Sequence, residues 1–247
     1  MKKLNFRNRT LKILLCTSIL INLSSLVLIL FYEIRTHDVQ IVLSTLGLCD
    51  IDESDKPDFY CINAWDRCIK KLNIDYDIAF MGNSIIYGGN FQREFNDKKI
   101  IEFGYPGDRV DKMIRRVPML QSVNPEKIFI MGGINDLHRS YPQTIYKRYD
   151  NLITSIKERL PNTKIYIQSI LPISRNQEKN YAKNSVINET NRLIMECAIK
   201  HKCTYIDLNS SFIKNGVLPS DFTDDGVHLT QLAYEKWYEI IRPYIYE

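Results

Sequence analysis

Three polar side chains could together form a nucleophilic serine site. Ser84 follows the apolar stretch 77–81 in DIAFMGNS, where a buried strand is expected to end. Asp225 and His228 lie in DDGVHLT, close enough in sequence to share a hydrogen bond that leaves one imidazole nitrogen facing a substrate. A serine needs such a base, and a third group that orients the base, to attack a carbonyl carbon. Taken alone, a serine here is more commonly a helix cap, and an Asp–His pair is more commonly part of a turn.

Two further segments could stabilise the negative charge that develops on the carbonyl oxygen. Asn135 follows a predicted strand and two glycines in GGINDL, so its amide could donate to that oxygen. Gly107, in GYPGDR, could offer its backbone N–H because glycine permits a close approach of the chain. Each segment by itself is also ordinary turn sequence. Among the other histidines, His201 is expected at the surface near the end of an amphipathic helix.

Short apolar segments alternate with segments of helical periodicity along the chain. The expected strands are 77–81, 99–103, 127–131, 164–171 and 204–208, and the expected helices are about 109–121 (broken at Pro118), 144–160, 180–201 and 230–242. This alternation predicts a parallel sheet covered on both faces. Ligands of such sheets bind beyond the carboxyl ends of the strands, so the loops after the first three strands should converge there. The tyrosine-rich final helix is expected to pack on the sheet.

The four segments, in this order, resemble the SGNH hydrolases, also called GDSL-type esterases and lipases. MGNSI aligns Ser84 with the family's nucleophile, and Gly107 in YPGDRV matches the glycine of the second block. Residues 133–136 match G-x-N-D, and the final D-x-x-H matches Asp225 and His228. The likeness covers approximately residues 77–242. Its one departure is Asn83 where the family has aspartate; because this neighbour is not the triad acid, the asparagine is expected to preserve the local hydrogen bonding.

The resemblance implies an α/β fold, a three-layer α/β/α sandwich with a central parallel sheet of about five strands, as in flavodoxin. It also implies a serine esterase that forms an acyl-enzyme intermediate. Ser84, His228 and Asp225 would form the triad, and the oxyanion would be held by the Ser84 N–H, the Gly107 N–H and the Asn135 amide. No metal or organic cofactor is required.

The N-terminal part of the chain has the pattern of a membrane anchor. Residues 1–12 are basic and contain no acid. Residues 13–32 carry no charge, and this segment is long enough to cross a hydrocarbon core of about 30 Å as a helix. The positive-inside rule then places the N-terminus in the cytoplasm and the rest of the chain outside. Residues 33–55 would form a stalk and 56–247 the hydrolase domain. Secretion after cleavage of a signal peptide is the alternative.

The charge balance does not favour a nucleic-acid partner. The chain has 33 basic and 29 acidic residues, and five of the basic ones precede position 13. The rest of the chain is therefore close to neutral, with 28 basic against 29 acidic residues. A surface that binds phosphates needs clustered Lys and Arg on the folded part.

The cysteines have no zinc-ligand spacing. Five lie beyond the predicted anchor: Cys49, Cys61, Cys68, Cys197 and Cys203. An oxidising compartment would permit pairs such as Cys61–Cys68 or Cys197–Cys203, and buried free thiols are an equal alternative. The pairing stays open.

The predicted substrate is an O-acyl ester, with O-acetyl favoured, of a carbohydrate or cell-envelope polymer. Polar residues in 85–95 and 138–143 would suit such a substrate. A lipid or lysophospholipid esterase and an O-acyltransferase are the nearby alternatives. A non-catalytic envelope-binding or assembly protein that retains the fold is the alternative from another class. The oligomeric state stays open.

Overall fold

The computed structural model describes residues 76–247. The anchor predicted at 13–32, the stalk at 33–55 and the cysteines before position 76 lie outside the described residues. Among the helices of residues 76–247, none is both long and apolar enough to span a bilayer.

A parallel five-stranded sheet forms the centre of this part of the chain, as predicted. Its strands are β1 (Ile78–Gly82), β2 (Ile100–Gly104), β3 (Lys127–Met131), β4 (Lys164–Gln168) and β5 (Thr204–Ile206), in the order β2-β1-β3-β4-β5. Gly82 of β1 pairs with Gly104 of β2 and with Met131 of β3. These three strands therefore end at the same level, and the loops that follow them leave from one edge of the sheet.

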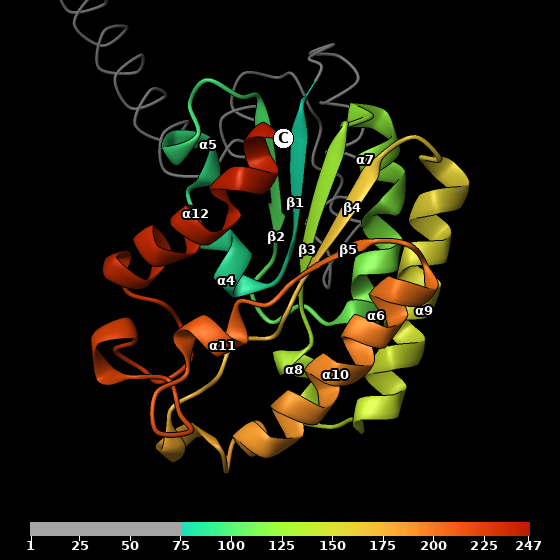
Figure 1. Ribbon diagram of the computed structural model, residues 1–247. Helices are drawn as coiled ribbons and strands as arrows, with labels where there is room; N and C mark the ends of the chain where they lie inside the picture. Colours follow the sequence, from blue (N-terminus) through green and yellow to red (C-terminus); the bar gives the residue numbers. More distant parts are fainter. Residues whose placement is uncertain (1–75) are drawn as a thin grey trace, which may run out of the picture. The chain divides into compact units, whose positions relative to one another are not determined.

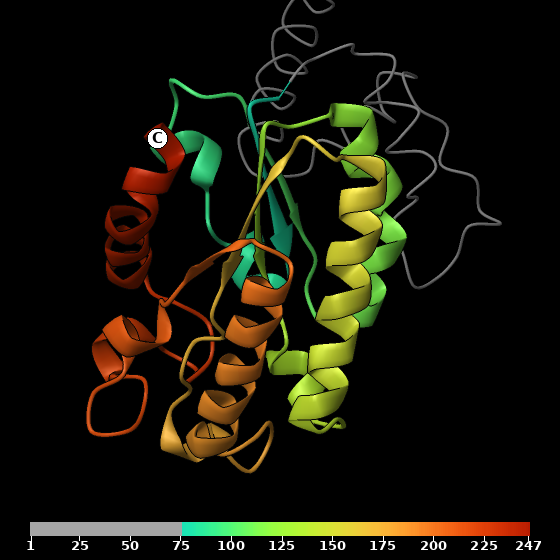
Figure 2. The same cartoon turned by 45° about the vertical axis from the view of Figure 1, so that its right-hand side comes forward.

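Helices cover both faces of the sheet (Figures 1 and 2). One face carries α12 (Gln231–Tyr246) with the short helices α4 (Ser84–Tyr87), α5 (Phe91–Glu94) and α11 (Asn209–Phe212). The other carries α6 (Val110–Met113), α7 (Val117–Val123), α9 (Pro142–Arg159) and α10 (Asn184–Lys200), and α8 (Ile134–Leu137) precedes α9. Short 3₁₀ turns occupy 114–116, 175–177 and 220–222.

The aromatic side chains of α12 are buried against the sheet, as predicted. Trp237 is fully buried, and its indole N–H donates to the Gln168 side chain at 2.7 Å. The hydroxyl of Tyr234 donates to the Ile85 carbonyl at 2.7 Å, and that of Tyr238 to the Gly89 carbonyl. Burial of these rings supplies hydrophobic stabilisation, and their hydroxyls fix the segment directly after Ser84.

The fourth strand is shorter than predicted. The expectation of a strand to 171 is wrong, because β4 ends at Gln168 and side chains bind the backbone of Ile170 and Ile173. Asn191 accepts from the Ile170 N–H and donates to the Ile170 carbonyl, and Asn184 does the same for Ile173. Backbone groups satisfied in this way need no neighbouring strand.

The predicted helix at 109–121 is broken earlier than expected. A 3₁₀ turn at Ile114–Arg116 interrupts it, and Pro118 lies in the first turn of α7. A proline there loses no helical hydrogen bond, so it begins the second helix instead of breaking the first. The turn leaves the Arg116 side chain fully buried.

At the end of α10 one expectation changes, and one alternative that the sequence left open is decided. His201 is not a surface residue: its side chain is only 14% exposed, and its Nε2 lies 2.6 Å from Asp150 Oδ1 on α9. Cys197 and Cys203 are free thiols, the first buried and the second half-buried, so a Cys197–Cys203 disulfide is absent. Cys197 instead belongs to the packed core.

Candidate active site

Ser84 is the first residue of α4, two residues beyond the end of β1. The cap of this helix is Asn83, whose side-chain oxygen accepts a hydrogen bond from the Ile85 N–H at 3.0 Å. Asn83 is buried, and it makes the local hydrogen bond expected where the family has aspartate. Because Asn83 supplies the cap, Ser84 is left to interact with another partner.

The Ser84 hydroxyl meets His228, and His228 meets Asp225. Ser84 Oγ lies 2.9 Å from His228 Nε2, and His228 Nδ1 lies 2.5 Å from Asp225 Oδ2. A contact with the Asp225 carboxylate assigns the Nδ1 proton to His228, which leaves Nε2 as the acceptor facing the serine. This is the geometry of an activated serine nucleophile, with a base and a group that orients the base.

The loop before α12 holds Asp225 ionised and in place. Burial opposes its ionisation, but hydrogen bonds from the His228 side chain and from the His228 and Val227 N–H groups outweigh burial and lower the Asp225 pKa to about 2. Gln177 donates to the Asp225 carbonyl at 2.6 Å. The sequence analysis did not identify Gln177, because nothing in the sequence brings position 177 next to position 225.

Gly107 occupies a tight turn beyond β2. The Asp108 N–H donates to the Tyr105 carbonyl at 3.1 Å across Pro106 and Gly107, and Gly107 has a φ of +74°. Proline followed by a residue with positive φ is typical of a type II turn, which explains the glycine. In residues 76–247 neither the Gly107 nor the Ser84 N–H donates to a protein acceptor, so both are available to an oxyanion.

Asn135 lies beyond the end of β3, and its side chain reaches the turn that contains Gly107. It lies in the first turn of α8, and its amide nitrogen donates to the Asp108 carbonyl at 2.9 Å. That bond uses one of the two amide hydrogens and leaves the second for an oxyanion. The structure thus joins Ser84, His228 and Asp225 by direct contacts, and joins Asn135 to the turn that carries Gly107.

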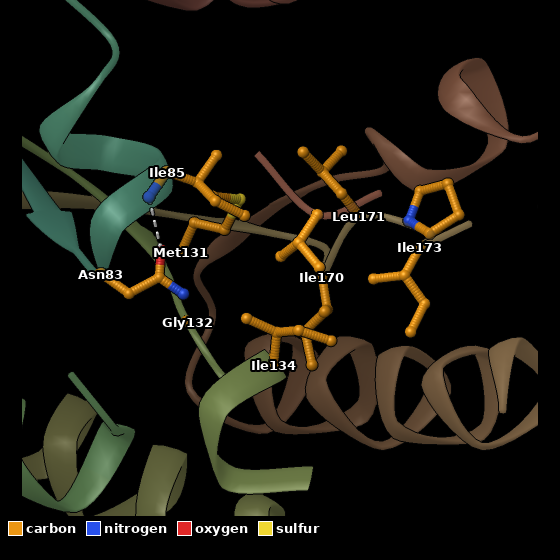
Figure 3. Close-up of a pocket in the computed structure, with 10 residues that line it drawn as sticks. Asn83, Ile85, Met131, Gly132, Ile134, Ile170, Leu171 and Ile173 are labelled. Atoms are coloured by element: carbon orange, nitrogen blue, oxygen red, sulfur yellow. Dashed lines mark hydrogen bonds between the residues drawn. The ribbon is translucent and has the colours of Figure 1, made fainter. Parts of the chain in front are cut away.

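A small apolar pocket lies among these loops (Figure 3). Its walls include Asn83 and Ile85 on either side of Ser84, Ile134 before Asn135, and Val227 before His228. Figure 3 shows Asn83 and Ile85 on one side and Leu171 and Ile173 on the other. The pocket volume is about 10 Å³, roughly the space that one water-sized group needs. The segments that flank the candidate residues therefore meet around one narrow apolar space.

One side-chain cluster in residues 76–247 has donor atoms suited to a metal. The ligand atoms of Asp150, Cys197 and His201 lie within 4.8 Å of one another. Asp150 already accepts from Lys200 and contacts His201, each at 2.6 Å. Burial, then the nearby Asp150 carboxylate, raises the pKa of the Cys197 thiol to about 12. Metals bind the thiolate, and a thiol with this pKa stays protonated. We therefore interpret the cluster as a polar contact between α9 and the end of α10, and not as a metal site.

Two relatives of known name are similar to the chain in sequence. An N-acylneuraminate cytidylyltransferase of Streptococcus agalactiae is 24% identical over 221 residues, which are 82% of this chain and 50% of that protein. The human platelet-activating factor acetylhydrolase IB subunit alpha1 is 21% identical over 165 residues, 64% of this chain and 70% of that protein. The chain thus spans about half the length of the streptococcal relative.

Solved structures share the fold and a family model matches the sequence. A Streptococcus pneumonia protein superposes with a TM-score of 0.68 at 22% identity, over 75% of this chain and 91% of that one. An acetyl xylan esterase superposes with a TM-score of 0.59 at 18% identity, over 68% and 98%. The model of the GDSL-like lipase/acylhydrolase family matches residues 80–236. The chain belongs to this family, whose members are hydrolases of ester bonds.

Proposed function

We propose that the protein hydrolyses short O-acyl esters, with Ser84 as nucleophile, His228 as general base and Asp225 as the triad acid. The observation that carries this proposal is the continuous pair of contacts from Asp225 through His228 to Ser84 Oγ. A solvated aspartate and a capping histidine would not be expected to contact Ser84, which lies two residues beyond the end of β1. The contact joins positions 144 residues apart.

The contacts support a two-step mechanism. His228 Nε2 takes the Ser84 proton as Oγ attacks the ester carbonyl, and Asp225 stabilises the imidazolium that forms. The oxyanion binds the N–H groups of Ser84 and Gly107 and the Asn135 amide. On collapse, His228 gives the proton to the departing alcohol and the acyl group stays on Ser84. A water then attacks with His228 again as base, which releases the acid and restores Ser84.

The small pocket argues against a long acyl group, and we favour acetyl over longer chains. Its apolar walls include sequence neighbours of Ser84, Asn135 and His228. The acyl part of the ester would lie in this pocket during attack. Each additional methylene needs volume that a packed interior does not give without strain. Two of the similar proteins, the acetyl xylan esterase and the acetylhydrolase subunit, are named for acetyl esters.

For the alcohol part of the ester, we favour a carbohydrate. One similar protein is named for acetyl xylan and another for N-acylneuraminate. The human relative, named for platelet-activating factor, favours a lipid alcohol as the second candidate. Some polar residues expected to contact substrate have other partners: the Gln92 side chain binds the Lys98 carbonyl and the Ile100 N–H.

Chain-length preference tests the acyl assignment. The full-length chain, purified in detergent, is expected to hydrolyse p-nitrophenyl acetate with a kcat/KM at least about 10-fold above that for butyrate, because the pocket wall resists added methylenes. O-acetylated xylooligosaccharide and an acetylated phospholipid, supplied in parallel, separate the two alcohol classes. A preference for butyrate or octanoate over acetate would contradict the assignment.

Shortening a pocket wall should relax that preference. Ile173→Ala removes a buried side chain on the side of the pocket opposite Asn83. We expect the butyrate-to-acetate ratio of kcat/KM to rise about 10-fold. Ile194→Ala, at a fully buried position that does not line the pocket, is the matched control for general destabilisation. Equal ratios in the two variants would exclude the pocket as the acyl site.

We also propose that residues 13–32 anchor the protein, with the hydrolase domain outside the membrane. The support is the uncharged 20-residue segment after a basic tail. The full-length chain should stay with the membrane pellet after alkaline carbonate extraction, and external protease should reach the domain in intact cells. Release into the medium as a shortened chain would favour signal cleavage instead.

A further inference from the structure

Arg116 is a fully buried arginine bound to the ends of the two strands that lead into the site. Its guanidinium donates to the Gly82 carbonyl at the end of β1, at 3.2 Å, and to the Phe103 carbonyl in β2. Gly82 is two residues before Ser84. The guanidinium also lies 4.4 Å from the centre of the Tyr105 ring, at the start of the Gly107 turn. The Arg116 side chain therefore contacts the segments that precede two predicted oxyanion donors, the Ser84 N–H and the Gly107 N–H.

Asp108 completes this arrangement from the other side. Its carboxylate, 3% exposed, pairs with Arg116, which is 0% exposed. Its backbone N–H closes the turn around Gly107, and its carbonyl accepts the Asn135 amide at 2.9 Å. The same residue thus pairs with the buried cation, closes the Gly107 turn and orients Asn135.

We propose that the Arg116–Asp108 pair is a positioning element of the oxyanion hole, which sets the Gly107 N–H and the Asn135 amide relative to Ser84. This inference rests on the proposed function. A buried ion pair is a weak source of stability, because both charges lose their hydration and an apolar pair of similar volume often serves as well. The Arg116–Asp108 pair contacts the end of β1, the Gly107 turn and Asn135. A role in fixing the geometry of the oxyanion donors explains why one ion pair makes all of these contacts.

The first test is Asp108→Asn, which keeps the side-chain shape and removes the charge. For hydrolysis of p-nitrophenyl acetate by the full-length chain we expect kcat to fall about 10- to 100-fold, as for a small misplacement of catalytic groups, while KM changes less than about 3-fold. In an Asn135→Ala background the same change should reduce kcat by a smaller factor than in the parent, because one of the two donors that the pair positions is already gone. Equal losses in both backgrounds would overturn the proposal.

A second variant separates positioning from stability. Arg116→Met with Asp108→Leu removes both charges and fills the space with apolar groups, a change that buried ion pairs often tolerate. We expect this double variant to keep a melting temperature close to that of the parent and to keep the 10- to 100-fold loss in kcat. Recovery of full kcat would show that the pair is merely structural. Arg116→Lys serves if the double variant does not fold, with the same expected loss.

Lys127→Met is the matched control for loss of a buried cation. Lys127 donates to the backbone oxygens of Tyr244, Ile245 and Glu247, each at 2.9 Å, from the start of β3 and away from the site. The Lys127→Met substitution should lower the melting temperature and leave kcat per folded molecule unchanged. The parent chain and Ser84→Ala are assayed alongside. Hydrolysis that is absent, or that does not depend on Ser84, would refute both the proposed function and this inference. Hydrolysis that depends on Ser84 but has an unchanged kcat in Asp108→Asn would refute this inference alone.

Discussion

Replacing His228 with alanine is expected to lower kcat for an acetyl ester by at least about 10⁴-fold. Without the imidazole, the Ser84 hydroxyl at 2.9 Å from Nε2 loses the group that takes its proton. The Asp225 carboxylate, which is a much weaker base than an imidazole, cannot take the serine proton in its place. The loss should appear in kcat more than in KM, because proton transfer occurs in the transition state.

The fold should survive this change. The His228 side chain is 51% exposed and forms no part of the core, so the melting temperature should remain within a few degrees of the parent. His201→Gln is the matched control: it alters another carboxylate-bound histidine, at the α9–α10 contact, and should leave kcat unchanged. Near-parental hydrolysis by His228→Ala would remove His228 as the base.

Asn135→Ala is expected to lower kcat by about 10² to 10³. The amide supplies one oxyanion donor directly, and its bond to the Asp108 carbonyl also steadies the turn that presents the Gly107 N–H. Since a donor to the oxyanion acts chiefly in the transition state, KM should change little. Steady-state kinetics with p-nitrophenyl acetate measures both constants.

Asn151→Ala controls for the loss of an asparagine from a helix. Asn151 is exposed in α9, so its replacement should alter neither kcat nor the melting temperature. If Asn135→Ala retained the parental kcat, the amide would have no role in charge stabilisation, and its bond to Asp108 would be purely structural. A large rise in KM alone would instead assign Asn135 to substrate binding.

The convergence of the site loops could be predicted because it depends on general rules for parallel sheets. Strands that alternate with helices place their following loops at one edge, and β1, β2 and β3 end at one level. The sequence alone could not decide between Ser84 and Asn83 as the helix cap, since both residue types cap well. The structure assigns the cap to Asn83.

Features that depend on packing between distant segments could not be predicted. Arg116 belongs to an amphipathic segment with a second arginine beside it, a pattern typical of a solvated face. The 3₁₀ turn at Ile114–Arg116 changes the direction of the side chains, and Arg116 becomes fully buried. The early end of β4 likewise depends on two asparagines of α10 that bind the backbone beyond Gln168.

Covalent labelling of Ser84 by a fluorophosphonate probe tests the central claim most directly. Phosphonylation requires an activated serine, so the parent chain should be labelled and the modified peptide should contain Ser84. Ser84→Ala should abolish labelling, and His228→Ala should slow it by orders of magnitude. A folded parent chain that is not labelled, or is labelled equally in Ser84→Ala, would contradict the assignment of Ser84 as the nucleophile.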